Sequence, residues 1–384
     1  MSTDRSRRTL FRVAGAAAGA ILASRHATAQ NVNLQGEAKA RPRMVTPHPE
    51  GFAGLEKRST VALIHGNDRR KIVHDALAAI DSEIQPRLKT KKYVLIKPNN
   101  VSGFLQAGET NADTLRGILD YLAPRFKGPV IIGESSAGET MRGFENFKYP
   151  AVVAEYKKQN VSLLDFNTEG KYVIQPLLDF NLHVVPARLA ARLFDPDAFV
   201  LGSAVLKTHN IAVVSLSVKN MVLGAPLHQA PKETARWSDK RRYHAGIRQS
   251  LYNIFITAQR MQPFWGATVI DGYEGMEGNG PGGTPISTNT VLASTDFIAA
   301  DRVGAEVMGV DANWLGWLKY CGEVGVGQWD LAKIDIQGAK IAEVRKKFRL
   351  HTDIELELKW MGPMEELPPN LGWVRPLGDE VKAS

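Results

Sequence analysis

Cysteine is nearly absent from this sequence, which has one such residue, Cys321, among 384. A single cysteine excludes a disulfide within the chain, and it excludes zinc or iron–sulfur sites built from several of its own cysteines. We therefore expect no self-ligated iron–sulfur cluster. Stability must come from a hydrophobic core, and a chain of this length with 44% hydrophobic residues can form one.

Long hydrophobic runs are also missing. The apolar run from Val13 to Ala23 has 11 residues, whereas a helix that crosses a bilayer needs about 20. No later stretch is long and apolar enough, so we expect no membrane span in the mature protein. Two common enzyme motifs are absent as well: there is no Gly-x-Ser-x-Gly elbow and no phosphate-binding loop that ends in Lys-Ser/Thr.

Residues 1–29 have the features of a twin-arginine signal peptide. The pair Arg7-Arg8 precedes the short apolar run, and residues 27–29 (Ala-Thr-Ala) give the pattern that signal peptidase accepts. Leu10 stands where the usual motif has phenylalanine. We predict export in the folded state by the twin-arginine translocase, to the periplasm or outside the cell. A generic secretory signal and an uncleaved anchor are the alternatives.

Removing this segment changes the charge of the chain. Five arginines and one aspartate lie within residues 1–30, so the formal net charge of +8 falls to +4. The remaining basic residues are spread along the sequence, whereas nucleic-acid binding requires a basic stripe. We therefore expect no nucleic-acid partner.

The rest of the chain predicts an α/β domain at 58–345, after an extended proline-containing linker at 30–57. Short apolar runs alternate with helical patterns, which indicates parallel strands buried on both faces. The fold class is a mainly parallel sheet flanked by helices, with a small antiparallel insertion near 172–185. A subdomain break is possible near 166, and residues 346–384 form a C-terminal tail. The predicted strands lie near 61–64, 93–96, 129–132, 161–164, 198–201, 267–270, 290–293 and 334–336, and the helices near 71–88, 110–122, 147–159, 215–223 and 297–308.

Polar or glycine-rich segments follow five of these strands, and parallel sheets bind ligands beyond the carboxyl ends of their strands. We expect these segments to converge on one cleft. They begin at Lys97-Pro98-Asn99-Asn100, Gly133-Glu134-Ser135, Lys207-Thr208-His209, Asp271-Gly272 and Ser294-Thr295-Asp296.

Lys219 lies on the predicted helix 215–223, among apolar residues. A partly buried lysine must pair with an anion or lose its proton. It therefore anchors an anionic ligand, has a lowered pKa, forms a salt bridge with an internal carboxylate, or extends its stem along the apolar surface with the amine in water. The sequence leaves these alternatives open.

Divalent metal binding is a second possibility. His209, His228 and His244 could ligate a metal, with Lys240, Arg241 and Arg242 just before the last of them, but their spacing matches no helix-face pair. Asp271 and Glu277 are speculative ligands too. The segment 278–283 could cradle a phosphate or close over a site as a mobile loop.

The polar segments also resemble a known family, the domain of unknown function family 362. The matching pieces run in family order over about residues 60–340. They are Ile96-Lys97-Pro98-Asn99, Gly133-Glu134-Ser135, Leu206-Lys207-Thr208-His209, Val218 to Gly224, Asp271-Gly272 with Glu277-Gly278 and Gly280-Pro281, and Ser294-Thr295-Asp296 with Ala300-Asp301. The resemblance implies an α/β fold and a polar site built from these loops, with no assigned chemistry. Many relatives carry a ferredoxin-like iron–sulfur module, which the single cysteine excludes here.

Three functions are compatible with these features. The first is an exported enzyme that acts on an anionic small molecule or cofactor; the second is a non-catalytic periplasmic protein that binds a ligand or metal. The third is a partner subunit of a redox complex, which an exposed apolar patch would favour. The catalytic candidates are Lys97, Lys207, His209, Lys219 and Glu134. The ligand-binding candidates are Asn99, Asn100, Ser135, Asn220, Gly280, Gly282 and Asp296.

Overall fold

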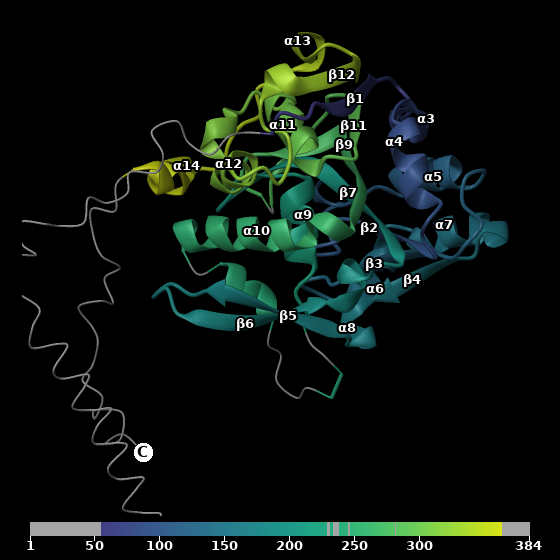
Figure 1. Cartoon of the computed structure of the whole chain (residues 1–384), viewed down its shortest axis with the longest axis horizontal. Coiled ribbons are helices and arrows are strands. Elements are labelled where there is room, and N and C mark those ends of the chain that lie inside the picture. The colour runs from purple at the N-terminus through teal and green to yellow at the C-terminus, as the bar shows by residue number, and fades with distance from the viewer. Residues whose placement is uncertain (1–54, 229–230, 233–237, 245, 281, 363–384) are drawn as a thin grey trace, which may run out of the picture. The chain divides into compact units, whose positions relative to one another are not determined.

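The structure is a computed structural model that describes residues 55–228, 231–232, 238–244, 246–280 and 282–362 (Figure 1). The predicted signal at 1–29 and most of the linker at 30–57 lie outside these residues. Among the helices that are described, none combines the length and apolar character that crossing a bilayer requires.

The central sheet confirms the predicted fold class. Its strands lie in the order β12-β1-β11-β9-β7-β2-β3-β4, and β10 and β8 pair with β9 and β7. Along this path the neighbours are parallel, except that β11 is antiparallel to both β1 and β9. The bounds are β1 (Ser59–His65), β2 (Tyr93–Lys97), β3 (Val130–Glu134), β4 (Val161–Asp165), β7 (Ala198–His209), β8 (Val213–Ser215), β9 (Trp265–Glu277), β10 (Thr284–Ile286), β11 (Thr290–Ser294) and β12 (Ile334–Gly338).

Helices cover both faces of the sheet, because its strands are apolar on both sides. One buried cluster packs α3, α5 and α7 on the sheet; the other packs α9, α10, α11 and α12 on its opposite face (Figure 1). The predicted helix 71–88 is divided at Ile80 into two. The bounds are α3 (Arg69–Ala79), α4 (Asp81–Leu88), α5 (Ala112–Leu122), α6 (Thr140–Asn146), α7 (Tyr149–Glu155), α8 (Phe166–Glu169), α9 (Ser217–Gly224), α10 (Ile247–Met261), α11 (Phe297–Val307), α12 (Gly316–Glu323) and α13 (Ile341–Val344).

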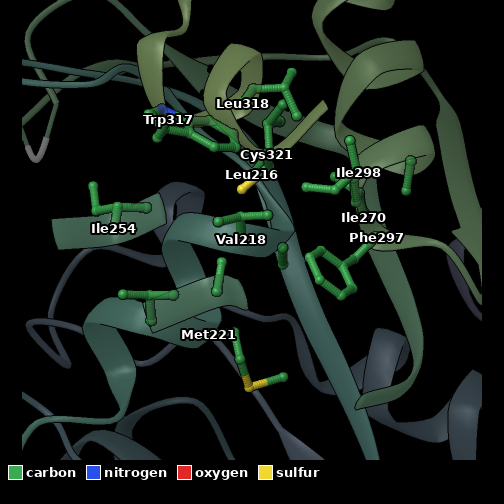
Figure 2. Close-up of a cluster of buried hydrophobic side chains, with 14 of the residues drawn as sticks. Leu216, Val218, Met221, Ile254, Ile270, Phe297, Ile298, Trp317, Leu318 and Cys321 are labelled. Carbon is green, nitrogen blue, oxygen red and sulfur yellow. The ribbon is translucent and has the colours of Figure 1, made fainter. Parts of the chain in front are cut away.

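Helix α9 is fixed by the second of these clusters. Val218 lies among buried side chains from α10, α11 and α12, such as Ile254, Phe297 and Trp317, and Met221 extends toward the sheet, where its methyl lies next to Gly202 of β7 (Figure 2). Since side chains three and four residues apart share one face of a helix, the residues between them, Lys219 and Asn220, lie away from this apolar group. Packing on one side of α9 therefore sets the position of its polar side.

The antiparallel insertion is present as a two-stranded ribbon, β5 (Tyr172–Leu178) and β6 (Val184–Ala190). Strand β5 of the ribbon contacts α10, and Leu177 and Leu189 are buried in the same hydrophobic cluster as the apolar side of that helix. Its other face carries exposed apolar side chains, of which Val184 is 72% exposed. Tyr172, Ile174, Phe180 and Leu182 are exposed near it.

Part of the segment that we predicted as a C-terminal tail belongs to the fold. Residues 346–362 are described, and they include α14 (Ile354–Glu357). Phe348 and Trp360 are buried in the core, and the Glu357 carboxylate accepts a hydrogen bond from the Val213 backbone N–H at 2.6 Å. The described residues belong to one compact unit, with no division near residue 166.

The strand order places a topological switch point between β2 and β7. From β2 the chain proceeds outward through β3 to β4, and it then returns to place β7 on the other side of β2. At such a point the connections leave in opposite directions and open a crevice beyond the carboxyl ends of the strands. Lys97 ends β2, and Lys207 lies near the end of β7, so both lysines lie at this crevice.

Candidate functional site

A cavity of about 450 Å³ lies at the switch point. Residues from the ends of β2, β3, β7 and β9 line it, together with residues of α9 and of the segment 238–244. The strand ends thus converge as expected, with one exception given below. The predicted site residues that line the cavity are Lys97, Asn99, Asn100, Glu134, Ser135, Lys207, His209, Lys219, Asn220, His228, His244 and Gly280.

Lys97 forms a buried ion pair with Glu134. Its ammonium Nζ lies 2.6 Å from Glu134 Oε2 and also donates to the Pro98 carbonyl at 2.7 Å and to Asn220 Oδ1 at 2.8 Å. Gly224 makes room for this lysine, because a Cβ at that position would lie 2.0 Å from Lys97 Cε. All three ammonium protons are used, so Lys97 organises the site and has no donor left for a ligand.

Lys207 has a different environment. Its Nζ donates to the Gly108 carbonyl at 2.7 Å, and burial lowers its pKa while the charge of Glu109 acts in the opposite direction. Glu109 is itself held by the backbone N–H groups of Val101 and Ser102, at 2.7 and 2.9 Å. This carboxylate therefore fixes the loop that follows β2 and balances the charge of Lys207.

Lys219 is the cavity lysine that no described residue binds. It is 6% exposed, and within the described part of the chain its Nζ has neither a hydrogen-bond acceptor nor a carboxylate within 4.0 Å. Burial, helped by the charges of Lys207 and Lys240, lowers the pKa of Lys219 well below its usual value. The salt bridge that the sequence left open does not form among these residues.

His209 lies beside Lys219 at the end of β7. Its Nδ1 accepts a hydrogen bond from the Ile211 backbone N–H at 3.1 Å, so the neutral ring carries its proton on Nε2. Burial, and then the charges of Lys219 and Lys207, lower the pKa of His209 well below its usual value. The imidazole is therefore neutral near pH 7 and has an N–H group to donate.

Lys240 is another cavity lysine with no described carboxylate within 4.0 Å. Its Nζ donates to the Leu223 carbonyl at 2.7 Å, and burial lowers its pKa to about 7. His244 lies one turn later, where Nδ1 donates to the Lys240 carbonyl at 2.8 Å. Burial lowers the pKa of His244 as well.

The asparagines position other groups. Asn220 accepts from Lys97 and donates to the Ser203 carbonyl at 3.1 Å, and Asn99 donates to the Gly108 carbonyl at 2.7 Å. Their hydrogen bonds connect β2, β7 and α9 beneath the cavity floor. We expected these amides to orient a ligand, whereas their contacts hold the lysines and the loop in place.

Asp296 was predicted at this cleft, and that placement is wrong. It follows β11, which is antiparallel to β9, so the end of β11 lies at the opposite edge of the sheet. There the carboxylate caps α11 by accepting from the backbone N–H groups of Ile298 and Ala299 at 3.0 and 3.1 Å. Asp296 thus caps the N-terminus of α11 and does not line the cavity.

The speculative metal ligands do not come together either. Asp271 is buried between Arg69, at 3.2 Å, and the Thr114 hydroxyl, at 2.5 Å. Glu277 accepts from the Arg349 backbone N–H at 2.9 Å. Neither lines the cavity, and neither does Gly282. In the described ranges no three His, Cys, Asp or Glu side chains are grouped closely enough to hold a metal ion.

Sequence reasoning missed three residues that matter here. Glu109 follows no strand, so its position in the chain gave no signal. Lys240 lies in a run of charged residues typical of a solvated surface. Asp301 appears among the family-like pieces without a function, and the structure shows it buried, with Oδ1 and Oδ2 accepting from the backbone N–H groups of Ser217 and Val218 at 2.8 and 2.9 Å.

A second hollow adjoins the cavity and shares Ser102, Ala137, His228 and Arg241 with it. It has a volume of about 780 Å³ and extends past the ends of β3 and β4 to the 70%-exposed ring of Phe104. A ligand longer than the cavity has room to extend in this direction.

Comparison with known proteins identifies a family for this chain but assigns it no activity. Residues 94–306 match the family described as "Domain of unknown function (DUF362)". No curated protein matches the chain. One solved structure, a crystal structure of a protein from Thermotoga maritima, is 10% identical with a TM-score of 0.34. The match covers 54% of this chain and 51% of the other, so the chain spans about half the length of that structure.

Proposed function

Since the chain belongs to the family "Domain of unknown function (DUF362)", whose description assigns no reaction, we propose a function from the cavity itself. The protein is an exported enzyme that acts on a small anionic molecule bound at the switch point. Lys207 and Lys240 attract the anion, and Lys219 and His209 carry the chemistry. The observation that carries this proposal is that buried Lys219 has no partner among the described residues and lies beside a neutral histidine.

Charge balance favours an anionic ligand. The basic side chains of Lys97, Lys207 and Lys240 line the cavity, against the two carboxylates that the structure describes there, Glu109 and Glu134. Glu134 forms an ion pair with Lys97, and the negative charge of Glu109 stabilises the protonated form of Lys207. Lys240 keeps no carboxylate within 4.0 Å among the described residues. A partly dry cavity with more cations than anions is stabilised by an incoming negative charge.

The state of Lys219 and His209 favours catalysis over simple capture. A binding site for an anion is best served by charged donors, whereas burial and neighbouring cations lower the pKa of both of these groups and so favour their neutral forms. A neutral amine can accept a proton or act as a nucleophile, and a neutral imidazole can donate from Nε2. Perturbed groups of this kind in a cavity are typical of active sites.

Anion binding is tested with inorganic sulfate and calorimetry. We expect Lys240→Met to weaken sulfate binding by about 10- to 150-fold, because a charge-assisted contact contributes about 1.5–3 kcal/mol. Lys92→Met is the matched control, since Lys92 is 76% exposed and pairs with Asp197 far from the cavity lining. Equal sulfate affinity in the Lys240→Met variant and the control would contradict the proposal.

The pH dependence of sulfate binding gives a further prediction. Below pH 7 Lys240 is protonated and attracts the anion; above pH 7 it loses the proton, because burial outweighs the favourable charges of Glu134 and Asp165. We expect sulfate affinity to fall by up to about tenfold per pH unit above neutrality. Lys240→Arg should remove most of this slope, since a guanidinium stays charged. A slope that persists in this variant would assign the titration to another group.

Export is proposed from the N-terminal residues alone. We expect replacement of Arg7 and Arg8 by lysine to lower the periplasmic yield strongly, because the twin-arginine translocase requires the arginine pair. Cell fractionation with immunodetection measures this yield. Arg12→Lys is the control, since it keeps the charge of the segment and leaves the pair intact. An unchanged periplasmic yield without the pair would refute this route.

A partner protein is a second candidate, which one observation favours. The outer face of the β5–β6 ribbon carries exposed Tyr172 and Ile174 toward one end and exposed Val184 at the other, with the exposed Pro176–Pro186 pair between them. Contiguous exposed apolar side chains are typical of protein contacts. The redox-partner hypothesis requires such a surface, and this ribbon supplies it.

A further inference from the structure

We propose that Lys219 forms an imine with the carbonyl carbon of an anionic aldehyde or 2-oxo acid bound in the cavity. This inference rests on the proposed function and names the substrate class of the same site. It assigns Lys219 as the nucleophile and His209 as the proton donor, and it places the anionic group of the substrate near Lys207 and Lys240.

The four cavity lysines differ in what their amines contact. Lys97 makes three hydrogen bonds, one of them to a carboxylate. Lys207 and Lys240 each donate to a backbone carbonyl at 2.7 Å. Lys219 has no such contact in the described residues, although 94% of its surface is covered, as its 6% exposure shows. A nucleophile needs a free lone pair, and this amine alone is not engaged as a donor.

The groups around Lys219 disfavour the charged form of its amine. Lys207, on β7, and Lys240, after α9, disfavour a third positive charge, and burial adds to their effect. Glu357, from α14, acts in the opposite direction. His209 and His244 contribute no positive charge near pH 7, because the pKa of each is lowered as well. Desolvation next to other cations is the known way to make a lysine nucleophilic.

The reaction balances without an external oxidant or reductant. The Lys219 nitrogen adds to the carbonyl carbon, a C–N bond forms, and the carbonyl oxygen receives a proton from His209 Nε2. The nitrogen returns one proton to His209, which gives a neutral carbinolamine. His209 Nε2 then protonates the hydroxyl, the C–O bond breaks as the nitrogen lone pair forms the second C–N bond, water leaves, and the last proton on the nitrogen restores His209. The water carries away the two protons that the amine held. His209 is suited to this step because its Nδ1 is occupied by the Ile211 N–H.

Both ends of such a substrate meet suitable groups. A carboxylate or phosphate next to the carbonyl is attracted by Lys207 and Lys240, which line the same cavity. The carbonyl then faces Lys219. A substrate without the negative charge lacks this attraction, and one without the carbonyl has nothing for the amine to attack.

Reductive trapping tests the imine. The purified full chain is incubated with pyruvate or with pyridoxal 5′-phosphate in the presence of sodium cyanoborohydride, and modified peptides are identified by mass spectrometry. We expect Lys219 to be the first lysine modified by at least one of these probes. The label should be absent from that peptide in Lys219→Arg and unchanged in Lys92→Arg, while lactate, which lacks the carbonyl, should give no adduct and should slow the labelling.

Two results overturn the inference. One is labelling confined to exposed lysines with both probes; the other is labelling of Lys219 that is no faster than that of Lys92. Sulfate calorimetry on the same preparation separates the two proposals. Sulfate binding without an adduct at Lys219 refutes the imine and leaves the anion-binding proposal standing, whereas loss of both refutes the proposed function itself.

Discussion

Lys97→Met should lower the free energy of unfolding by about 3–5 kcal/mol. The substitution removes one partner of a fully buried ion pair and leaves the Glu134 carboxylate, 1% exposed, without its counter-charge. An uncompensated buried charge has a cost of this size. The Asn220 Oδ1 and the Pro98 carbonyl also lose their donor. Urea unfolding followed by tryptophan fluorescence measures the change.

The chain contains a matched control for this prediction. Lys92 lies just before the strand that Lys97 ends, and it pairs with Asp197 at 2.7 Å. Since this lysine is 76% exposed, Lys92→Met should change the stability by less than about 1 kcal/mol. If both variants lowered the free energy of unfolding by a similar amount, the buried ion pair of Lys97 would not contribute specially to the stability of the protein. A double variant, Lys97→Met with Glu134→Leu, should recover part of the loss because no charge remains.

The sheet was predictable from the sequence for a physical reason. Strands buried on both faces must be continuously apolar, and the runs 93–96 and 129–132 have that property and became β2 and β3, whereas the edge strand β4 is only partly buried. Their polar ends then follow from the geometry of parallel strands. Most of the cavity lining could therefore be predicted from the residues that follow these apolar runs.

Strand direction was not predictable in the same way. An apolar run such as 290–293 has the same composition whichever way the strand runs, and β11 is antiparallel to its neighbours. The direction depends on the short connection from β9 through β10, which brings the chain back along the sheet. Asp296 was misplaced for this reason, since one reversal moves a strand end to the opposite edge.

The pairing of buried charged side chains also could not be predicted from the sequence. Lys97 and Lys219 are both lysines in apolar surroundings, and only the fold shows that the first meets Glu134, 37 positions away, whereas no described carboxylate lies within 4.0 Å of the second. Asp271 was similarly ambiguous until its partner, Arg69, was known. Partners distant in the sequence decide whether a buried charge is structural or reactive.

Asp301→Ala should be nearly as destabilising as loss of the buried ion pair, at about 3–4 kcal/mol. Helix α9 begins without a capping side chain at Leu216, and Asp301 of α11 supplies the missing acceptors. Its two carboxylate oxygens bind the Ser217 and Val218 N–H groups, and Oδ1 also accepts from the Ser217 hydroxyl. Removing the carboxylate leaves two buried N–H groups unsatisfied, each at about 1–3 kcal/mol.

The effect should extend to the site, because Lys219 lies one residue beyond the two N–H groups that Asp301 holds. Asp311→Ala is the control: Asp311 is exposed, and its carboxylate caps a short 3₁₀ turn by accepting from the Asn313 N–H at 2.9 Å. Loss of such a cap costs about 1 kcal/mol. Urea unfolding gives the stability of both variants, and hydrogen exchange shows whether the α9 amides open. In Asp301→Ala we expect faster exchange across 217–220 and slower trapping of Lys219. Unchanged exchange there would mean that the apolar contacts of Val218 and Met221 hold α9 without the carboxylate.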